Sequence, residues 1–545
     1  RAPRVLDPFS GGGAIPLEAM RLGCETFAMD INPVACFILR ATLEYPQKLA
    51  GKTCPLPDFA LKNKAFMKDF LSAHPQYAPI KQGSLLKGKR TPVQGSLCDT
   101  KASKQEGQPV ADLAWQVRAW GQHVLEEARK ELGRFYPTYA EFEPWAMEHA
   151  HPYEKLPPKL VPLTAEGVPD MHALNGDFSD EYIKDEGNAR WVEKPTVAYL
   201  WARTCRCSSC RAEIPLLKTK WLCKKDGKRV LLTVTPKEDK SGVVFGVQEN
   251  VPIVGGNNKQ RKAHDAQIGK GFMSRTGVTC PCCGATMTMD DIKIEGKSGR
   301  IGMVPTAVVY EQTNVNGKRY RLHTQEEMAC AREAADFLEE IYRDIPYGMP
   351  TEPTPVGGSS GAGRAFSVYA YGMTRWCDLF TPRQLLALGV FCKAVRKAMT
   401  ECLDKGYPQE WAEAIGVYLA IILDKTASYN SGVCSWIKDL EALRDTFPRF
   451  ALPMVWDIAE LAIINDVGGS FQAQMEWVNK FLENNVSTLI NLSSPTVIRQ
   501  SCIQSLPEQL DCIITDPPYY DAIPYSDCMD FFYVWLRRTT SGTIL

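Results

Sequence analysis

The first thirty residues of the chain follow the order strand, glycine-rich turn, helix, strand, and this order constrains the fold more than any other feature. Residues 4–7 have the apolar pattern of a short buried strand, and residues 8–13 form a turn that ends in three glycines. A helix over 15–22 and a second strand over 26–30 follow. This order is typical of the first unit of a parallel nucleotide-binding sheet, so it predicts an α/β fold.

The turn and the end of the second strand carry the candidate ligand contacts. Gly11 and Gly13 would let backbone N–H groups approach a ligand at the start of a helix. Asp30 ends the second strand, where an acid is placed to bind a ribose diol, so we expect an adenosine compound. Ile15 and Pro16 stand where the dinucleotide-binding motif requires a small residue, and this disfavours a dinucleotide as the ligand. A tight turn without a ligand is the alternative.

A second motif lies near the other end of the chain. Residues 510–515 have the pattern of a buried parallel strand, and Asp516, Pro517, Pro518 and Tyr519 follow at its C-terminal end. Two prolines cannot continue a sheet ladder, so they must leave the strand in a stiff turn. Asp516 and the Pro517 carbonyl could accept both N–H groups of an exocyclic base amine while Tyr519 stacks on the base. The alternative is a turn with a surface acid and a core tyrosine.

The two motifs together resemble a known family. Phe-x-Gly-x-Gly over 9–13, paired with Asp-Pro-Pro-Tyr over 516–519, resembles the amino-methyltransferases of DNA, which act on adenine N6 or cytosine N4. The longer stretches 371–385 and 516–536 are similar to prokaryotic adenine-specific DNA methylases that contain a zinc ribbon. The likeness covers most of the chain and is most specific at its two ends and in the ribbon.

This resemblance implies a Rossmann-like sheet that binds S-adenosyl-L-methionine and methylates the N6 amine of an adenine flipped out of DNA. It also implies a role in restriction-modification or phage defence, with defence-system partner proteins that are unknown. RNA guanine-N2 and DNA cytosine-N4 methylation are the alternative reactions, and a zinc-dependent nucleic-acid-binding protein with a dead cofactor pocket is the non-enzymatic alternative. The residues implied to bind the cofactor are Asp7, Phe9, Gly11, Gly13 and Asp30, and the implied catalytic residues are Asp516, Pro517, Pro518 and Tyr519.

A large insertion must separate the two motifs, because a compact sheet domain needs few residues between them. Members of the family continue beyond both motifs, so we expect a fragment of a longer protein. The stretch 499–506 departs from the family because it lacks the acid that contacts the adenine ring. The expected division is a first part of the methyltransferase core over 1–46, a mostly helical insertion over 47–195, a zinc ribbon with a β-meander over 196–322, a helical region over 323–480 and the second part of the core over 481–545.

Two Cys-x-x-Cys pairs predict a metal site inside the insertion. Cys207 and Cys210 form the first pair, and Cys280 and Cys283 form the second. Four thiolates on two knuckles can close a tetrahedral Zn²⁺ site, which would be structural because no coordination position stays open. Disulfides or a redox pair are the alternatives. Three further cysteines leave the ligand set open: Cys205, Cys223 and Cys282.

Shorter patterns predict individual elements of the insertion. They indicate a helix over 111–135, strands over 196–201, 230–234 and 242–246, a hairpin over 308–321 that turns at Asn316-Gly317, capped helix starts at Thr324 and Thr381, and a helical stretch from 381 to about 465. The polar and aromatic clusters 424–431 and 456–460 resemble the surface of a substrate cleft. Such clusters are more often helix caps and buried hydrogen-bond networks.

Charge and hydropathy limit the partners of the chain. The 63 basic residues balance the 63 acidic residues, so a polyanion must be held by a local patch. No apolar run approaches the roughly 20 residues that span a bilayer, and we expect a cytoplasmic prokaryotic protein without a membrane partner. The ribbon offers a basic surface that could hold phosphates, although a solvated face is the alternative. Its residues are Lys218, Lys220, Lys224, Lys225, Lys228, Arg229, Lys259, Arg261, Lys262, Lys270 and Arg275.

Overall fold

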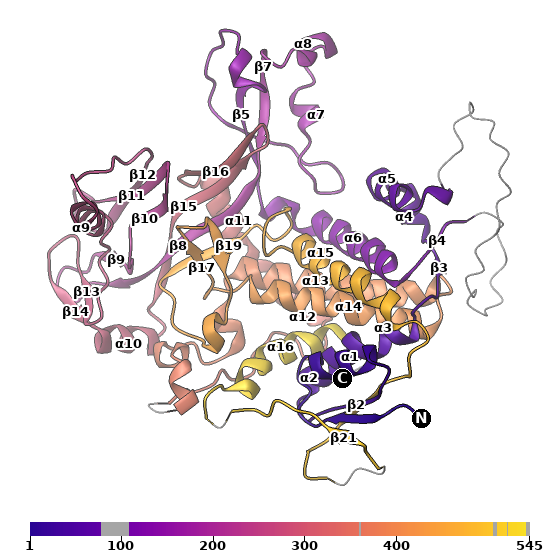
Figure 1. Cartoon of the computed structure of the whole chain (residues 1–545). Helices are drawn as coiled ribbons and strands as arrows, with labels where there is room; N and C mark the ends of the chain where they lie inside the picture. The colour runs from indigo at the N-terminus through magenta and orange to yellow at the C-terminus, as the bar shows by residue number, and fades with distance from the viewer. Residues whose placement is uncertain (78–107, 359–360, 505–508, 520, 541–545) are drawn as a thin grey trace.

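The computed structural model describes residues 1–77, 108–358, 361–504, 509–519 and 521–540 (Figure 1). The two ends of the chain meet in one sheet, made of β1 (Arg4–Asp7), β2 (Glu25–Asp30), β20 (Thr496–Arg499) and β21 (Cys512–Ile513). Its order is β20-β2-β1-β21, and every neighbouring pair is parallel. The expected α/β class is confirmed, and the rest of the chain is inserted between the second and third strands of this sheet.

Helices from the N-terminal segment cover the sheet. α1 (Ala14–Arg21) packs Leu17 and Met20 into a small core with the middle of β2. α2 (Pro33–Leu39) begins at Asn32, whose side chain caps the helix by accepting a backbone N–H. The helix then passes through a π-helical turn, Arg40–Glu44, into α3 (Tyr45–Lys48). Such turns are frequent near functional sites.

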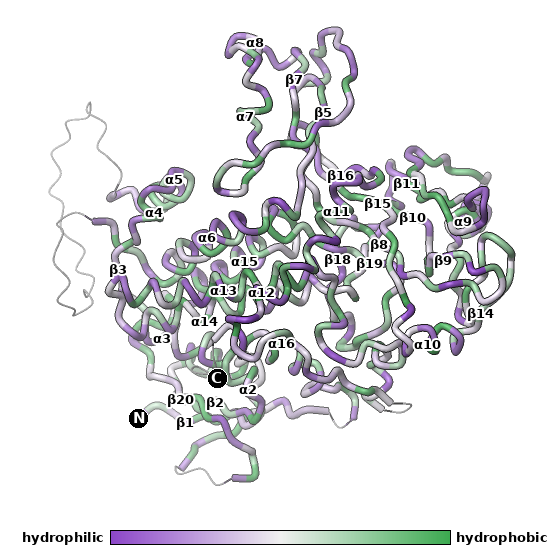
Figure 2. The backbone as a smooth tube through the Cα atoms, turned by 180° about the vertical axis from the view of Figure 1, so that it is seen from behind, coloured by the Kyte–Doolittle hydropathy of each residue, from purple (hydrophilic) through white to green (hydrophobic). Residues whose placement is uncertain are grey.

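A layer of long helices, four from the insertion and one from the C-terminal segment, forms the main apolar core. It consists of α6 (Leu113–Leu132), α13 (Pro382–Asp404), α14 (Gln409–Ser428), α15 (Phe471–Asn485) and α16 (Tyr525–Thr540), which pack on one another. The predicted helix over 111–135 is thereby confirmed, as are the caps at Thr381 and at Thr324, which starts α11 (Gln325–Glu333). In Figures 1 and 2 the parallel sheet lies at one side of this layer, well apart from the strands of the ribbon.

The ribbon region is built from antiparallel strands. The central strand β8 (Thr196–Arg206) pairs with β15 (Gly302–Gln312), β19 (Asp457–Leu461) and β9 (Glu213–Pro215), and β16 (Val315–Arg321) completes this sheet. A meander of β10 (Trp221–Lys225), β11 (Lys228–Pro236) and β12 (Val243–Gln248) and the pair β13 (Gly277–Thr279) and β14 (Thr286–Thr288) follow. The strands predicted over 196–201, 230–234 and 242–246 are confirmed.

The structure corrects two predictions within the insertion. The stretch to about residue 465 is not helical throughout, because β17 (Ser435–Ile437), β18 (Ala442–Arg444) and β19 follow α14. Residues 457–461 form the strand β19 because they pair with the buried strand β8. The hairpin turns at Thr313-Asn314 and not at Asn316-Gly317. The Asn314 side chain there donates to the carbonyl oxygens of Pro144 and Trp145 at 3.3 and 3.0 Å, so tertiary contacts override the local turn preference.

Other elements complete the insertion. Residues 139–194 form a three-stranded antiparallel sheet, in which β5 (Tyr139–Pro144) lies between β6 (Lys159–Leu160) and β7 (Ala189–Lys194). The expected helical insertion over 47–195 therefore contains strands as well as helices. Among the described residues, no helix combines the length and the apolar character needed to cross a membrane. The remaining bounds are β3 (Cys54–Pro55), α4 (Asp58–Lys62), α5 (Lys64–Ala73), β4 (Val110–Ala111), β5 (Tyr139–Pro144), β6 (Lys159–Leu160), α7 (Met171–Leu174), α8 (Asp180–Lys184), β7 (Ala189–Lys194), α9 (Asn258–Ile268), α10 (Met289–Lys297) and α12 (Leu338–Arg343).

Candidate active site and metal centre

The parallel sheet brings the two sequence motifs to the same edge. β1 and β21 are neighbours, with Leu6 opposite Ile513, and the Ile514 N–H donates to the Leu6 carbonyl at 3.0 Å. The register is held by Asp511, which accepts the Arg4 N–H at 2.9 Å and the Arg1 guanidinium at 2.8 Å. Both strands run in the same direction, so the glycine-rich turn and the Asp-Pro-Pro-Tyr segment leave the sheet side by side.

The glycine-rich turn is fastened to the end of β2. The Gly11 N–H donates to Oδ2 of Asp30 at 3.0 Å. Ser10 makes the second link, since its N–H donates to the Met29 carbonyl at 3.0 Å and its Oγ accepts the Met29 N–H at 3.1 Å. Asp7 accepts the Phe9 N–H at 3.1 Å. The structure therefore brings together all five residues that the sequence assigns to cofactor binding, with Gly13 at the start of α1.

Gly13 is the position in this turn where a side chain cannot be accommodated. Its φ is +86°, and a Cβ there would lie 3.0 Å from Cδ2 of Leu39. Replacing Gly13 by Ala is expected to lower the free energy of unfolding by about 1–3 kcal/mol. Urea denaturation measures this effect. Gly12→Ala is the matched control, because nothing lies within 4 Å of its added Cβ. Equal stability of the two variants would contradict the prediction.

Three carboxylates gather around this edge of the sheet. Asp7 is buried, and burial is the main reason why its pKa is raised. The Phe9 N–H and the Thr515 side chain lower that pKa, whereas the negative charges of Asp30 and Asp516 raise it further. Asp516 therefore lies close enough to Asp7 for their charges to interact. Such a cluster of negative charge suits a ligand with cationic groups, such as a sulfonium and an ammonium.

The Asp-Pro-Pro-Tyr segment itself faces solvent. Tyr519 is 58% exposed, and its hydroxyl lies 3.4 Å from Oδ1 of Asp516. The preceding strand is also exposed, with Ile513 at 61%, although its sequence predicts burial on both faces. The reason is its place in the sheet, because β21 is an edge strand that pairs only with β1 among the described residues. The ring of Tyr519 is accordingly free to stack on a base.

Gln500 is a further polar residue at this edge, which sequence reasoning missed. It directly follows β20, and its backbone N–H donates to the Asp30 carbonyl at 3.1 Å. Its side-chain nitrogen Nε2 is buried and has no hydrogen-bond partner among the described residues. No sequence motif marks this position, because the family carries an acid in this stretch and not an amide. The amide of Gln500 offers both a donor and an acceptor beside Asp30.

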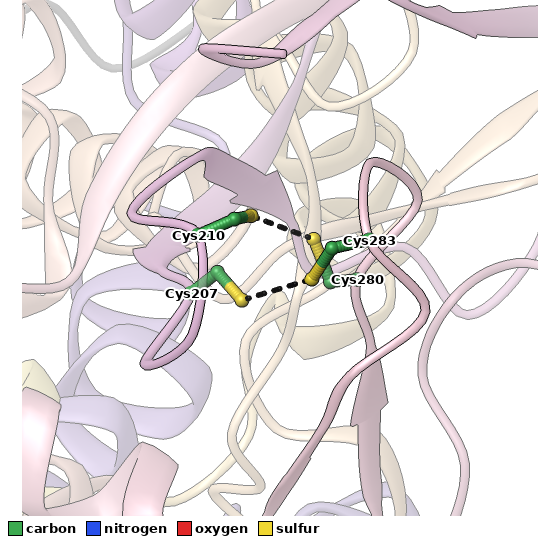
Figure 3. A group of neighbouring side chains, drawn as sticks. All are labelled: Cys207, Cys210, Cys280 and Cys283. Atoms are coloured by element: carbon green, nitrogen blue, oxygen red, sulfur yellow. Dashed lines mark hydrogen bonds between the residues drawn. The ribbon is translucent and has the colours of Figure 1, made fainter.

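The four predicted cysteines form one compact cluster. The Sγ atoms of Cys207, Cys210, Cys280 and Cys283 all lie within 4.8 Å of one another. The Cys207–Cys283 and Cys210–Cys280 sulfurs are each 3.7 Å apart, as Figure 3 shows. A Zn–S distance of about 2.3 Å places tetrahedral sulfurs about 3.8 Å apart, so the cluster can hold a metal such as zinc. Cys205, Cys223 and Cys282, which the sequence left open as ligands, lie outside this cluster.

The two knuckles share one backbone geometry. The Arg211 N–H donates to the Cys207 carbonyl at 3.0 Å, and the Gly284 N–H donates to the Cys280 carbonyl at 2.9 Å. The two residues have φ of 63° and 77°, the left-handed region. The N–H of Ala285 and the neighbouring cysteines lower the pKa of the Cys283 thiol to about 7, whereas burial raises the pKa of the Cys280 thiol in the same cluster.

Arg211 is therefore strained where the second knuckle has glycine. Arg211→Gly is expected to raise the free energy of unfolding by about 0.5–1 kcal/mol, because the exposed arginine side chain makes no hydrogen bond among the described residues. Gly284→Ala should lower it by about 1 kcal/mol. Thermal unfolding of the zinc-loaded chain measures both. A destabilised Arg211→Gly variant would refute the argument from backbone conformation.

The basic surface of the ribbon is only partly available. Asp265 forms salt bridges with Lys224 and Arg229, and Glu441 forms salt bridges with Lys225 and Lys228. Within the described residues, Lys218, Lys220 and Lys270 form no salt bridge and stay available for phosphates.

Comparison with known proteins adds no relative. No family model, curated protein or solved structure matches the chain.

Proposed function

We propose that the chain is an S-adenosylmethionine-dependent methyltransferase with a Rossmann-like sheet that methylates the N6 amine of adenine in DNA. The observation that carries the proposal is the parallel pairing of β1 with β21, which sets the glycine-rich turn beside Asp516. In open parallel sheets, ligands bind at the C-terminal ends of the strands. A cofactor site and a base site at that edge would be in direct contact.

The residues of the turn fit the methyl donor. Asp30 closes the turn through Gly11 and keeps further carboxylate lone pairs for a ribose diol. Because Gly13 has no side chain, the backbone N–H groups at the start of α1 can face the carboxylate of the methyl donor. Asp7, Asp30 and Asp516 supply negative charge near a cationic ligand. The donor supplies an electrophilic methyl group on sulfur.

The Asp-Pro-Pro-Tyr segment fits an exocyclic amine. The amine lone pair of adenine is delocalised into the ring, so its nitrogen must be oriented and its N–H groups polarised. Asp516 and the Pro517 carbonyl accept these two N–H groups, and Tyr519 stacks on the ring. A base inside a duplex could not reach this segment, so the target is flipped out or single-stranded. The zinc site is structural in this scheme.

The test is methyl transfer from labelled S-adenosylmethionine into unmethylated DNA and into tRNA, followed by nucleoside analysis. N6-methyladenine in DNA is the expected product. N4-methylcytosine in DNA, or N2-methylguanine in tRNA, would replace the proposal by one of the other amino-methyl transfers. Nucleic-acid binding with neither cofactor binding nor methyl transfer would overturn it in favour of a zinc-dependent binding protein.

A further inference from the structure

A cavity of about 340 Å³ lies between the ribbon meander and the β17–β19 segment. It is remote in sequence from both methyltransferase motifs. Four of the twelve tryptophans of the chain line it, namely Trp201, Trp221, Trp436 and Trp456. Such a concentration of aromatic rings around a cavity is typical of sites that bind planar ligands, since every nucleobase offers a π-face for stacking.

One carboxylate faces this cavity without a full set of partners. Asp457 begins β19, and its Oδ2 accepts the Lys218 N–H at 3.3 Å. Its Oδ1 is shielded from solvent and has no hydrogen-bond partner among the described residues. A buried polar atom without a partner is costly unless a ligand or water satisfies it. The cavity therefore combines aromatic walls with one acceptor that lacks a donor.

The mouth of the cavity carries the opposite charge. Lys218 and Arg444 line it, both residues are exposed, and neither forms a salt bridge within the described part of the chain. Two unpaired cations at the rim disfavour a cationic ligand such as a methylated ammonium group and favour a phosphate. Aromatic walls, a buried acceptor and a basic rim together match a nucleotide.

The loop beside the cavity also packs against the helix that follows the Asp-Pro-Pro-Tyr segment. The loop that precedes β19 carries Trp456 into the cavity and packs Phe447 against Phe531 of α16, with ring centroids 5.1 Å apart. The Cys528 thiol of the same helix contacts the Phe450 carbonyl at 3.7 Å. α16 is the helix that follows the Asp-Pro-Pro-Tyr segment, so internal packing joins the segment that lines the cavity to that motif.

We propose that this cavity binds an unstacked nucleobase with an exocyclic amine, using Asp457 as the acceptor and Lys218 and Arg444 for the adjoining phosphate. This is a second base site, and it goes beyond the proposed methyl transfer because it requires no cofactor. Thymine lacks an exocyclic amine and offers only its ring N3–H as a donor, so we expect the site to bind adenine more tightly than thymine.

Protonation of Asp457 adds a pH dependence. Burial raises the pKa of Asp457 to about 7, although the N–H groups of Lys218 and Thr219 and the positive charges of Lys218 and Lys438 lower it. A protonated carboxyl both donates and accepts, which fits the ring nitrogen and the amine of adenine. Affinity for adenine should therefore fall as the pH rises through about 7 and Asp457 loses its proton.

The experiment measures fluorescence anisotropy of labelled single-stranded oligo(dA) and oligo(dT), about 12 nucleotides long, with the whole chain and no methyl donor. We expect oligo(dA) to bind about fivefold more tightly than oligo(dT), and Asp457→Leu, which has neither acceptor nor donor, to remove this preference. Arg444→Glu should weaken binding of both about tenfold, whereas Arg332→Glu, the same change on α11 outside the cavity, should not. Equal effects of these two charge reversals would overturn the proposal.

Two further variants separate this cavity from other sites. The preference for oligo(dA) should persist in Asp516→Ala, and its loss there would assign base recognition to the Asp-Pro-Pro-Tyr segment instead. Failure of methyl transfer by the wild-type chain leaves this readout intact, so the two proposals fail separately. Binding of tetramethylammonium that Asp457→Asn abolishes would identify a cation site and reject the nucleotide.

Discussion

Asp516→Ala is expected to reduce methyl transfer by about 10²–10³-fold or more, because it removes the acceptor that orients and polarises the target amine. Binding of S-adenosylmethionine should change far less, since Asp30 and the glycine-rich turn are untouched. Single-turnover methyl transfer and isothermal titration measure the two quantities. The loss should appear in the rate of the chemical step and not in cofactor affinity.

The exposure of Asp516 makes this variant unusually informative. Its side chain has one hydrogen-bond partner among the described residues, the Tyr519 hydroxyl at 3.4 Å. Its removal should therefore change the free energy of unfolding by less than about 0.5 kcal/mol. Asp69→Ala, an exposed aspartate on α5, is the matched control. Asp516→Asn keeps one acceptor and should retain more activity than Asp516→Ala. Methyl transfer by Asp516→Ala near the wild-type rate would exclude Asp516 from catalysis.

The strands β1 and β21 could be predicted from the sequence because a recognisable turn follows each of them. Three glycines after residues 4–7 and two prolines after 510–515 each mark a strand end, and parallel strands bring such ends to the same edge. The pairing of β1 with β21 could not be derived from periodicity. It depends on long-range contacts, such as those of Asp511 with Arg1 and Arg4.

The errors have one physical origin, which is tertiary contact that overrides local preference. Asn316-Gly317 is a strong turn signal, yet the hairpin turns at Asn314, whose side chain is held by carbonyls of a distant strand. Residues 457–461 lie in a region of helical pattern but pair with β8. Gln500 belongs to no sequence motif, and it is recognised as a site residue only from its position beside Asp30 in the structure.

The candidate metal site is the site that the sequence predicts in most detail, because two Cys-x-x-Cys pairs fix both the ligand type and the knuckle geometry. Cys280→Ser is expected to abolish binding of one equivalent of zinc and to destabilise the ribbon by several kcal/mol. Structural zinc binding is worth about 10 kcal/mol or more in small zinc domains, and a neutral hydroxyl is a poor replacement for a thiolate. Zinc content and hydrogen exchange over β13 and β14 measure these effects.

Cys282→Ser is the matched control for this prediction. Cys282 lies between the two ligands of the second knuckle, but its thiol donates to the Gly242 carbonyl at 3.4 Å and stands outside the cluster. A serine hydroxyl can make the same contact, so zinc content and exchange rates should stay close to those of the wild type. Because Cys207 and Cys280 also belong to the main apolar core, chelation of the wild-type protein should lower its overall unfolding temperature. Full zinc content in Cys280→Ser, or equal loss in Cys282→Ser, would show that the four-cysteine cluster is not the metal site.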